Sequence, residues 1–138
     1  MDAIPAALRG AGKEFSVSDT TLIAVIEDDG SVRLAVRSLV RALGYDARGF
    51  ESAEDFLASD AVDGIACIIT DIQMPGMSGI DLKRHLAAHG NAVPVIMITA
   101  RVEPDLESQA LASGAVCFLR KPFQAEALIS CLNSALAD

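Results

Sequence analysis

Apolar and polar residues follow two different periods along the chain after the first twenty positions. Short runs rich in valine and isoleucine alternate with longer segments in which apolar residues recur every three or four positions. A continuous apolar run is typical of a strand buried on both faces, and the longer period is that of an amphipathic helix. Five alternations predict an α/β fold in which helices cover a parallel sheet. The predicted strands are 22–26, 46–50, 65–70, 95–99 and 116–119.

Local signals mark where several predicted helices begin and end. Ser52 and Ser78 are each followed three positions later by an aspartate, a pattern that resembles the capping box of a helix N-terminus. Glycines follow three helical segments and precede strands, where a residue with left-handed backbone is wanted. These glycines are Gly44, Gly90 and Gly114. The boundaries therefore agree with the alternation of strands and helices.

Length and composition indicate a single globular domain. The chain has 138 residues, 51% hydrophobic and 22% charged, and we place the domain at 21–138 after a flexible N-terminal extension at 1–20. The net charge of −8 disfavours direct binding to nucleic acid or anionic lipid, because both are polyanions. Residues 1–20 contain no apolar run of signal-peptide length, and no later segment approaches the roughly 20 apolar residues that cross a bilayer. We therefore expect a cytoplasmic protein without a membrane partner.

The three cysteines show no spacing typical of a metal site. Cys67, Cys117 and Cys131 are odd in number and far apart, and the first two lie inside apolar runs. A free thiol packs like a small hydrophobic side chain. We interpret all three as reduced thiols of the core and regard a disulfide as the weaker alternative.

Charged and polar side chains stand at the carboxyl ends of the predicted strands. In a doubly wound sheet these ends meet at one edge, so residues distant in sequence become neighbours there. Carboxylate oxygens are ligands that Mg²⁺ prefers, and hydroxyl and ammonium groups suit the oxygens of a phosphoryl group in transfer. A carboxylate can itself carry that group covalently. The residues concerned are Glu27, Asp28 and Asp29, then Asp71, Thr99, Lys121 and Pro122.

Four motifs in their order resemble the receiver domains of two-component response regulators. They are VIEDD at 25–29, TDIQMPGMSG at 70–79, ITA at 98–100 and KPF at 121–123. The resemblance covers about residues 22–136 and is nearest to receivers of the FixJ and NarL type, which precede helix-turn-helix output domains. It implies a CheY-like, flavodoxin-like fold of five strands in the order 2-1-3-4-5 with five helices.

The resemblance also assigns roles to individual residues. It makes Asp71 the phosphoacceptor, and it places Mg²⁺ or Mn²⁺ on Glu27, Asp28, Asp71 and the backbone carbonyl of Gln73. Asp28 is the expected direct ligand, because Glu27 is longer than the more usual aspartate and can act through water. Asp29 is expected to be a bystander. The phosphoryl-binding and switch residues would be Thr99, Ala100, Lys121 and the aromatic Phe118, with a cis peptide bond before Pro122.

Partners and regulation are likewise implied by the resemblance. A histidine kinase or a histidine phosphotransfer protein would donate the phosphoryl group. A downstream effector or a second copy of the chain would bind the face of the fourth helix, fifth strand and fifth helix. Arg33 and Arg37 are candidate contacts for the donor, although a solvated helix face is the simpler interpretation. Gln73 and Arg101 are candidates for tuning the lifetime of the acyl phosphate.

Several alternatives remain at this stage. We expect a receiver acting alone, and the nearest alternative is the receiver part of a DNA-binding transcriptional regulator. An aspartyl-phosphate phosphohydrolase would turn over substrates, but such enzymes commonly carry a general acid two residues after the nucleophile, where this chain has Gln73. We therefore expect no enzyme activity beyond the domain's own phosphorylation and dephosphorylation. A flavin-binding protein and a partner-binding domain without phosphorylation are weaker alternatives, and His85 with His89 favours surface histidines over a zinc site.

Overall fold

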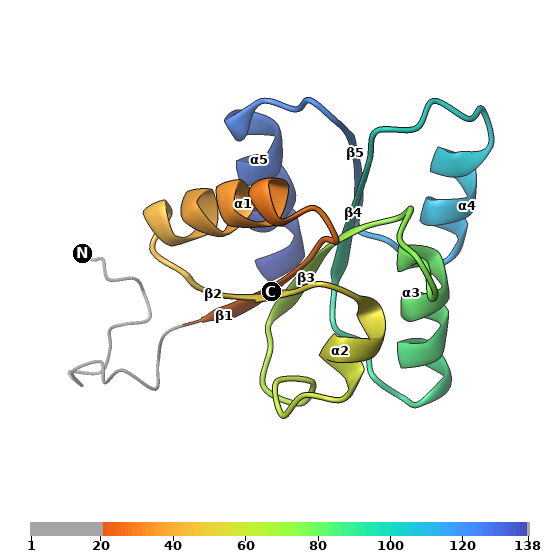
Figure 1. The fold of residues 1–138 in the computed structure, drawn as a ribbon, viewed down its shortest axis with the longest axis horizontal. Coiled ribbons are helices and arrows are strands. Elements are labelled where there is room, and N and C mark those ends of the chain that lie inside the picture. The colour runs from red at the N-terminus through yellow and green to blue at the C-terminus, as the bar shows by residue number, and fades with distance from the viewer. Residues whose placement is uncertain (1–20, 138) are drawn as a thin grey trace.

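The computed structural model describes residues 21–137 and forms one five-stranded sheet in these residues. The sheet is parallel, in the order β2-β1-β3-β4-β5, which confirms the predicted class and topology (Figure 1). The predicted extension at 1–20 lies outside the described residues. The elements are β1 (Leu22–Ile26), α1 (Gly30–Ala42), β2 (Asp46–Phe50), α2 (Ala53–Leu57), β3 (Cys67–Asp71), α3 (Gly79–Ala88), β4 (Val95–Thr99), α4 (Leu106–Ala112), β5 (Cys117–Arg120) and α5 (Ala125–Leu136).

The helices form two layers, one on each face of the sheet. Helices α1 and α5 cover one face, and α2, α3 and α4 cover the other (Figure 1). Each layer has its own apolar core, the first including Val40 and Leu132 and the second including Phe56, Leu82 and Leu106. The central strands supply buried residues to both cores, which explains their unbroken apolar sequence.

Strands β3 and β5 differ at both ends from the predicted ranges. Strand β3 begins at Cys67 and continues through Asp71, whose Cα pairs in register with that of Ile98 on β4. Strand β5 includes Arg120, which pairs with Thr99. The sheet therefore extends one residue further at its carboxyl edge than the apolar runs indicate, because backbone pairing continues past the last apolar side chain.

The predicted helix signals are confirmed in most details. Ser78 forms a complete capping box with Asp81, whereas Ser52 accepts a hydrogen bond from the Asp55 N–H at the start of α2. The three predicted terminating glycines all have positive φ, at 101° for Gly44, 76° for Gly90 and 106° for Gly114.

The interpretation of the cysteines is right for one residue and wrong for two. Cys67 is a free, buried thiol, and burial raises its pKa to about 12. Cys117 on β5 and Cys131 on α5 form a disulfide, with their Cα atoms 5.8 Å apart. The pairing depends on how α5 packs against the neighbouring strand, and a sequence separation of 14 residues does not reveal that contact.

None of the helices in residues 21–137 is long and apolar enough to cross a membrane. The longest, α1, has 13 residues, and arginines recur along it.

Candidate functional site

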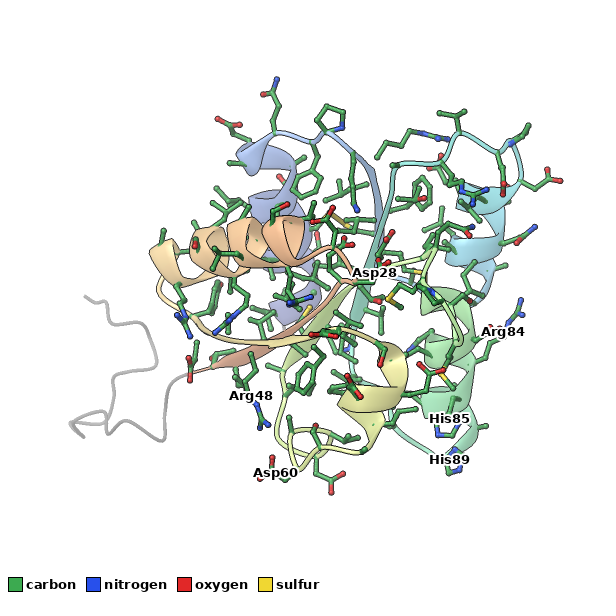
Figure 2. The ribbon with its side chains drawn as sticks, in the orientation of Figure 1. Asp28, Arg48, Asp60, Arg84, His85 and His89 are labelled. Carbon is green, nitrogen blue, oxygen red and sulfur yellow. A yellow bond between two sulfur atoms is a disulfide. The ribbon has the colours of Figure 1, made fainter. Side chains whose placement is uncertain are left out.

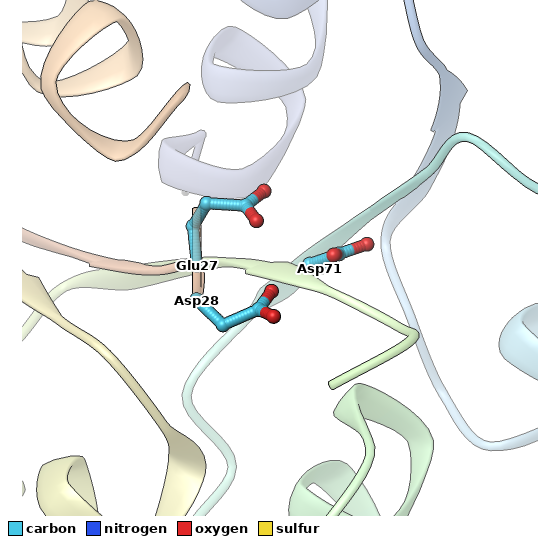
Figure 3. Close-up of side chains that lie close together, drawn as sticks. All are labelled: Glu27, Asp28 and Asp71. Atoms are coloured by element: carbon cyan, nitrogen blue, oxygen red, sulfur yellow. The ribbon is translucent and has the colours of Figure 1, made fainter. Parts of the chain in front are cut away.

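The carboxyl edge of the sheet brings together the charged residues that were separate in the sequence. Asp28 follows β1, while Asp71 is the last residue of β3 and Lys121 comes directly after β5. Carboxylate oxygens of Glu27, Asp28 and Asp71, one from each residue, lie within 4.8 Å of one another. Figure 3 shows Glu27 and Asp28 projecting to opposite sides of the chain, with Asp71 beside them. The site lies next to the reversal of strand order between β1 and β3, where α/β sheets commonly bind ligands.

Asp71 is a buried carboxylate that, among the described residues, has a hydrogen-bonding or charged partner for only one of its two oxygens. Its exposed fraction is 6%, and the Lys121 Nζ lies 3.7 Å from Oδ2. Its Oδ1 has no hydrogen-bond partner among the described residues. Burial, together with the charge of Glu27, raises its pKa to about 6, although Lys121 opposes this shift. A buried oxygen without a partner costs free energy and is available to a cation or a phosphorus atom.

Glu27 is buried deeper than Asp71 but has partners for both carboxylate oxygens. Its Oε1 accepts a hydrogen bond from the Lys121 Nζ at 2.8 Å, and its Oε2 accepts one from the Asp29 N–H at 3.1 Å. Burial lowers the pKa of Lys121, but the hydrogen bond with Glu27 and the charges of Asp71 and Glu27 outweigh it and raise that pKa. Glu27 therefore holds the lysine ammonium beside Asp71, and its oxygens are less free to bind a metal than those of Asp28.

The acidic group fits a divalent cation. Asp28 is exposed, so its carboxylate is accessible to a cation, and Asp71 Oδ1 is free of protein partners in residues 21–137. Gln73, two residues beyond Asp71, belongs to the loop at 72–78 that joins β3 to α3. One or two carboxylates plus carbonyl and water oxygens are the usual ligands of Mg²⁺. The acidic group of Glu27, Asp28 and Asp71 can therefore hold a metal, and the Gln73 carbonyl stays a predicted ligand.

Thr99 and the loop that follows it form another wall of the site. Thr99, the last residue of β4, is fully buried, and its Oγ1 accepts a hydrogen bond from the Arg101 N–H at 3.0 Å. Ala100 is exposed. The Arg101 guanidinium forms an ion pair with Glu103 at 3.1 Å. The peptide bond between Lys121 and Pro122 is cis, as the resemblance implies.

The family of the chain follows from comparison with known proteins. The model of the response regulator receiver domain family matches residues 23–133. The chain belongs to this family. The chain is similar to the response regulator protein TmoT of Ectopseudomonas mendocina, with 34% identity over 91% of this chain and 57% of the relative. Curated relatives include transcriptional regulatory proteins, and the chain spans about half of the length of those it matches.

Solved structures agree with this assignment. The receiver resembles the response regulator StyR with a TM-score of 0.78 and 35% identity, over 85% of this chain and 59% of that one. It also resembles FixJ-N with a TM-score of 0.77 and 29% identity, over 84% of this chain and 93% of that one. The resemblance to the FixJ type is thus confirmed.

In this receiver, the predicted switch aromatic lies between an apolar core and an arginine side chain. Phe118 on β5 is partly buried against the core of α2, α3 and α4. The guanidinium carbon of Arg120 lies 5.3 Å from the centre of its ring. Arg120 also donates a hydrogen bond to the Arg101 carbonyl at 3.2 Å and approaches Glu107 of α4 at 4.0 Å. Arg120 therefore connects the loop after Thr99, helix α4 and the aromatic ring.

The arginine stripe of α1 is not the solvated face that its spacing indicates. Arg33 donates a hydrogen bond to the Glu27 carbonyl at 2.7 Å, and Arg37 donates one to the Ala47 carbonyl at 3.4 Å. Both side chains are half-buried, and their stems lie so close to Gly49 of β2 that a Cβ there would be 2.8 Å from Arg37 Cδ. The arginines cover the edge strand, which a helical spacing cannot reveal. Their contact with a phosphodonor stays a prediction.

Two acidic residues have positions that sequence reasoning did not fully assign. Asp29 is the N-cap of α1, accepting hydrogen bonds from the N–H groups of Ser31 and Val32, which agrees with its role as a bystander to the metal. Glu54 of α2 was missed altogether. Its Oε2 accepts a hydrogen bond from the Met77 N–H at 2.8 Å, within the loop that contains Gln73. A contact across 23 positions leaves no signal in a single sequence.

The two histidines lie far from this edge, on the last turn of α3. Their ring centres are 4.3 Å apart, and the His89 Nδ1 is 2.8 Å from the His85 carbonyl oxygen (Figure 2). They line a pocket of about 660 Å³ with Asp63 and Asn91. Within residues 21–137, the acidic group of Glu27, Asp28 and Asp71 is the only cluster of three metal-binding side chains. A pair of stacked surface histidines is the simpler interpretation.

Proposed function

We propose that the receiver accepts a phosphoryl group on Asp71 from a phosphohistidine of a histidine kinase or a histidine phosphotransfer protein. A carboxylate oxygen of Asp71 bonds to phosphorus, the phosphorus–nitrogen bond of the donor breaks, and the donor histidine keeps the electron pair. The observation that supports this proposal most strongly is the buried Asp71 carboxylate, which has one oxygen without a partner among the residues described and the Lys121 ammonium 3.7 Å from the other. The ammonium can neutralise charge on the phosphoryl oxygens.

The proposed cofactor is Mg²⁺, or Mn²⁺, held by Asp28, Asp71 and the Gln73 carbonyl. When bound, the cation would offset the mutual repulsion of the carboxylates and the negative charge of the phosphoryl oxygens. The orphaned Oδ1 of Asp71 and the exposed carboxylate of Asp28 support this assignment. Glu27 serves the same centre by holding Lys121 at 2.8 Å.

The docking surface proposed for the phosphodonor adjoins the site. A pocket of about 600 Å³ lies between α1 and the segment after β5, and its lining includes Val32, Leu39, Lys121 and Phe123. Lys121 belongs both to this pocket and to the acidic centre, so a helix of the donor seated here could bring its histidine to Asp71. Arg33 and Arg37 do not line this pocket but donate to the Glu27 and Ala47 carbonyls, so their contact with the donor would have to come from the neighbouring face of α1.

The proposed output surface is the face of α4, β5 and α5, which would bind a downstream effector or a second copy of the chain. Leu111 is 47% exposed on α4, and Val116, just before β5, is 38% exposed. Arg120 links this face to the loop after Thr99 through the Arg101 carbonyl. A phosphoryl group that forms a hydrogen bond with the Thr99 hydroxyl would therefore disturb the contacts of Arg120 and the packing of the Phe118 ring.

Action as a lone receiver stays a prediction. The relatives include proteins named as transcriptional regulatory proteins, and the chain matches about half of their length. Their names favour the alternative in which the same receiver controls a DNA-binding domain. Phosphorylation-dependent self-association through α4, β5 and α5 would serve that arrangement, and light scattering with and without a small phosphodonor tests it.

A phosphohydrolase that turns over small substrates is the rival from another class. Gln73 stands where the general acid would be needed and cannot donate a proton as a carboxylic acid does. We propose that the receiver only phosphorylates and dephosphorylates itself. Multiple turnovers of p-nitrophenyl phosphate per molecule of protein would contradict this.

The decisive experiment is incubation with acetyl phosphate and Mg²⁺, followed by intact mass measurement. The wild type should gain one phosphoryl group of about 80 Da, and Asp71→Asn should gain none, because the nucleophilic carboxylate is absent. Asp63→Asn, which removes an exposed carboxylate near the opposite edge of the sheet, is the matched control and should be modified like the wild type. An adduct on Asp71→Asn, or none on the wild type, would reject the proposed function.

A further inference from the structure

A side chain of α2 forms a hydrogen bond with the backbone of the loop at 72–78. The Glu54 Oε2 accepts a hydrogen bond from the Met77 N–H at 2.8 Å, within the normal range of a charge-assisted bond. The Gly79 N–H donates to the Ile72 carbonyl at 3.1 Å, which joins the two ends of the loop, and Ser78 caps α3 at the second end. At the first end, the Ile72 N–H donates to the Ile98 carbonyl of β4 at 2.9 Å. The Glu54 bond ties the part of the loop next to α3 to a neighbouring helix.

Gly76 makes room for this bond. Its φ is +80°, in the region that favours glycine, and a Cβ at this position would lie 2.6 Å from the Glu54 Oε2. A side chain here would therefore displace the carboxylate as well as strain the turn. The glycine and the glutamate act together at one point of the loop.

Helix α2, which carries Glu54, is short but is anchored by buried side chains. Ala53 and Phe56, on either side of Glu54 in sequence, are fully buried in the core. The Phe56 ring packs edge-on against Phe50 of β2 at 5.3 Å between ring centres. The Glu54 side chain itself is at the surface, so it can be exchanged without disturbing the core.

We infer that Glu54 is a positioning residue for the metal centre, which it serves by fixing the loop that presents the Gln73 carbonyl; this inference rests on the proposed function. Mg²⁺ demands a nearly ideal octahedron of ligands, so small displacements of one oxygen weaken binding. Residues that orient metal ligands from behind commonly change metal affinity about tenfold or more when they are replaced. The same loop also contributes the Gln73 N–H, which partly opposes the rise that burial and Glu27 cause in the pKa of Asp71.

The hydrogen bond of Glu54 must be separated from its charge. Glu54→Ala removes both, whereas Glu54→Gln removes the charge and keeps an oxygen that can accept from the Met77 N–H. Glu51→Ala removes one exposed carboxylate from the same segment and serves as the control for long-range electrostatics. A urea titration of each variant, without metal, reports any change in the stability of the fold.

The experiment measures the Mg²⁺ affinity of each variant by calorimetry and the hydrogen exchange of the Met77 amide by NMR, the latter without metal. We expect Glu54→Ala to weaken Mg²⁺ binding about tenfold and to speed exchange at Met77, since the acceptor is lost. Glu54→Gln should restore affinity to within about twofold of the wild type, and Glu51→Ala should stay within the same range.

Three results would overturn the inference. Equal Mg²⁺ affinity of wild type and Glu54→Ala would show that the bond does not serve the metal centre. Equal weakening by Glu54→Gln and Glu54→Ala would assign the effect to charge alone. A wild type that binds no Mg²⁺ would remove the metal centre and this inference together, whereas failure at Glu54 alone leaves the phosphorylation of Asp71 intact.

Discussion

The two edges of the sheet each contain a buried or half-buried lysine, but the lysines have different partners. At the carboxyl edge, Lys121 lies between Glu27 at 2.8 Å and Asp71 at 3.7 Å. Towards the amino edge, Lys83 of α3 is 9% exposed, and its Nζ donates to the Val93 carbonyl at 3.5 Å. Among residues 21–137, Lys121 forms ion pairs with carboxylates and Lys83 forms none.

This difference separates residues that serve chemistry from residues that serve packing. The carboxyl edge keeps three carboxylates close together and leaves Asp71 Oδ1 without a partner among residues 21–137, which costs stability. The amino edge contains the larger of the two pockets, the histidine pair and Cys117, the first residue of β5, which forms the disulfide with Cys131. Pocket size alone would therefore assign the functional site to the amino edge. Buried charge and an unsatisfied hydrogen-bond acceptor assign it to the carboxyl edge.

The largest expected effect is on the rate of phosphorylation when the lysines are exchanged for methionine. Lys121→Met should slow phosphorylation by acetyl phosphate about 10²–10³-fold, because it removes the cation that faces the phosphoryl oxygens. Lys83→Met should leave the rate within about twofold, since its hydrocarbon stem is kept and its ammonium faces a backbone carbonyl. Intact mass against time measures both. Similar losses in the two variants would contradict the distinction between the edges.

The disulfide should affect stability and leave the site unchanged. Reduction of Cys117–Cys131 should lower the free energy of unfolding by about 3 kcal/mol, the value for a loop of about 15 residues. Urea titration with and without reductant measures this change, and alkylation after denaturation should label only Cys67 in the unreduced protein. The phosphorylation rate should not change. Labelling of all three thiols before reduction would show that the bond is absent.

Asp71 should make the apo protein less stable at neutral pH than at mildly acidic pH. Its pKa is about 6 in the folded state against 3.8 for the free group, so the folded state binds more protons between these values. The free energy of unfolding should therefore fall as the pH rises from about 4 to about 6. Asp71→Asn should gain about 1–3 kcal/mol at pH 7 with a chelator present.

The matched control for this pH dependence is Asp60, an exposed carboxylate paired with Arg48 at 2.9 Å (Figure 2). The hydrogen bond and charge of Arg48 lower its pKa, so its small contribution is present at neutral pH and is lost as the pH falls. Asp60→Asn should not stabilise the protein at pH 7. The same pH slope in wild type and Asp71→Asn would show that Asp71 is not the group responsible.

The smallest expected effect belongs to the histidine pair. His89→Gln loses one ring contact and a surface hydrogen bond, so the free energy of unfolding should change by less than about 0.5 kcal/mol. Phosphorylation should be unaffected, because the pair lies on the last turn of α3, away from the acidic centre. A large loss of phosphorylation in this variant would extend the functional region beyond the carboxyl edge.

The sequence predicted the architecture because its patterns are local. Unbroken apolar runs such as that of β4 need two covered faces, and terminating glycines such as Gly114 mark helix ends wherever the chain later packs. The site was predictable for a related reason. Once the strands are parallel, Asp71 and Lys121 must follow strands that end at the same edge.

The tertiary structure decided the contacts between elements, because a single sequence does not encode which side chains meet across a gap. The arginines of α1 cover β2, Cys117 reaches Cys131, and Glu54 reaches the Met77 N–H only after the helices pack. The sequence by itself determined which groups stand at strand ends and helix ends. Packing decided their pKa values and their partners, and it left one buried oxygen of Asp71 without a partner in the described part of the chain, since burial and distance arise only in the folded chain.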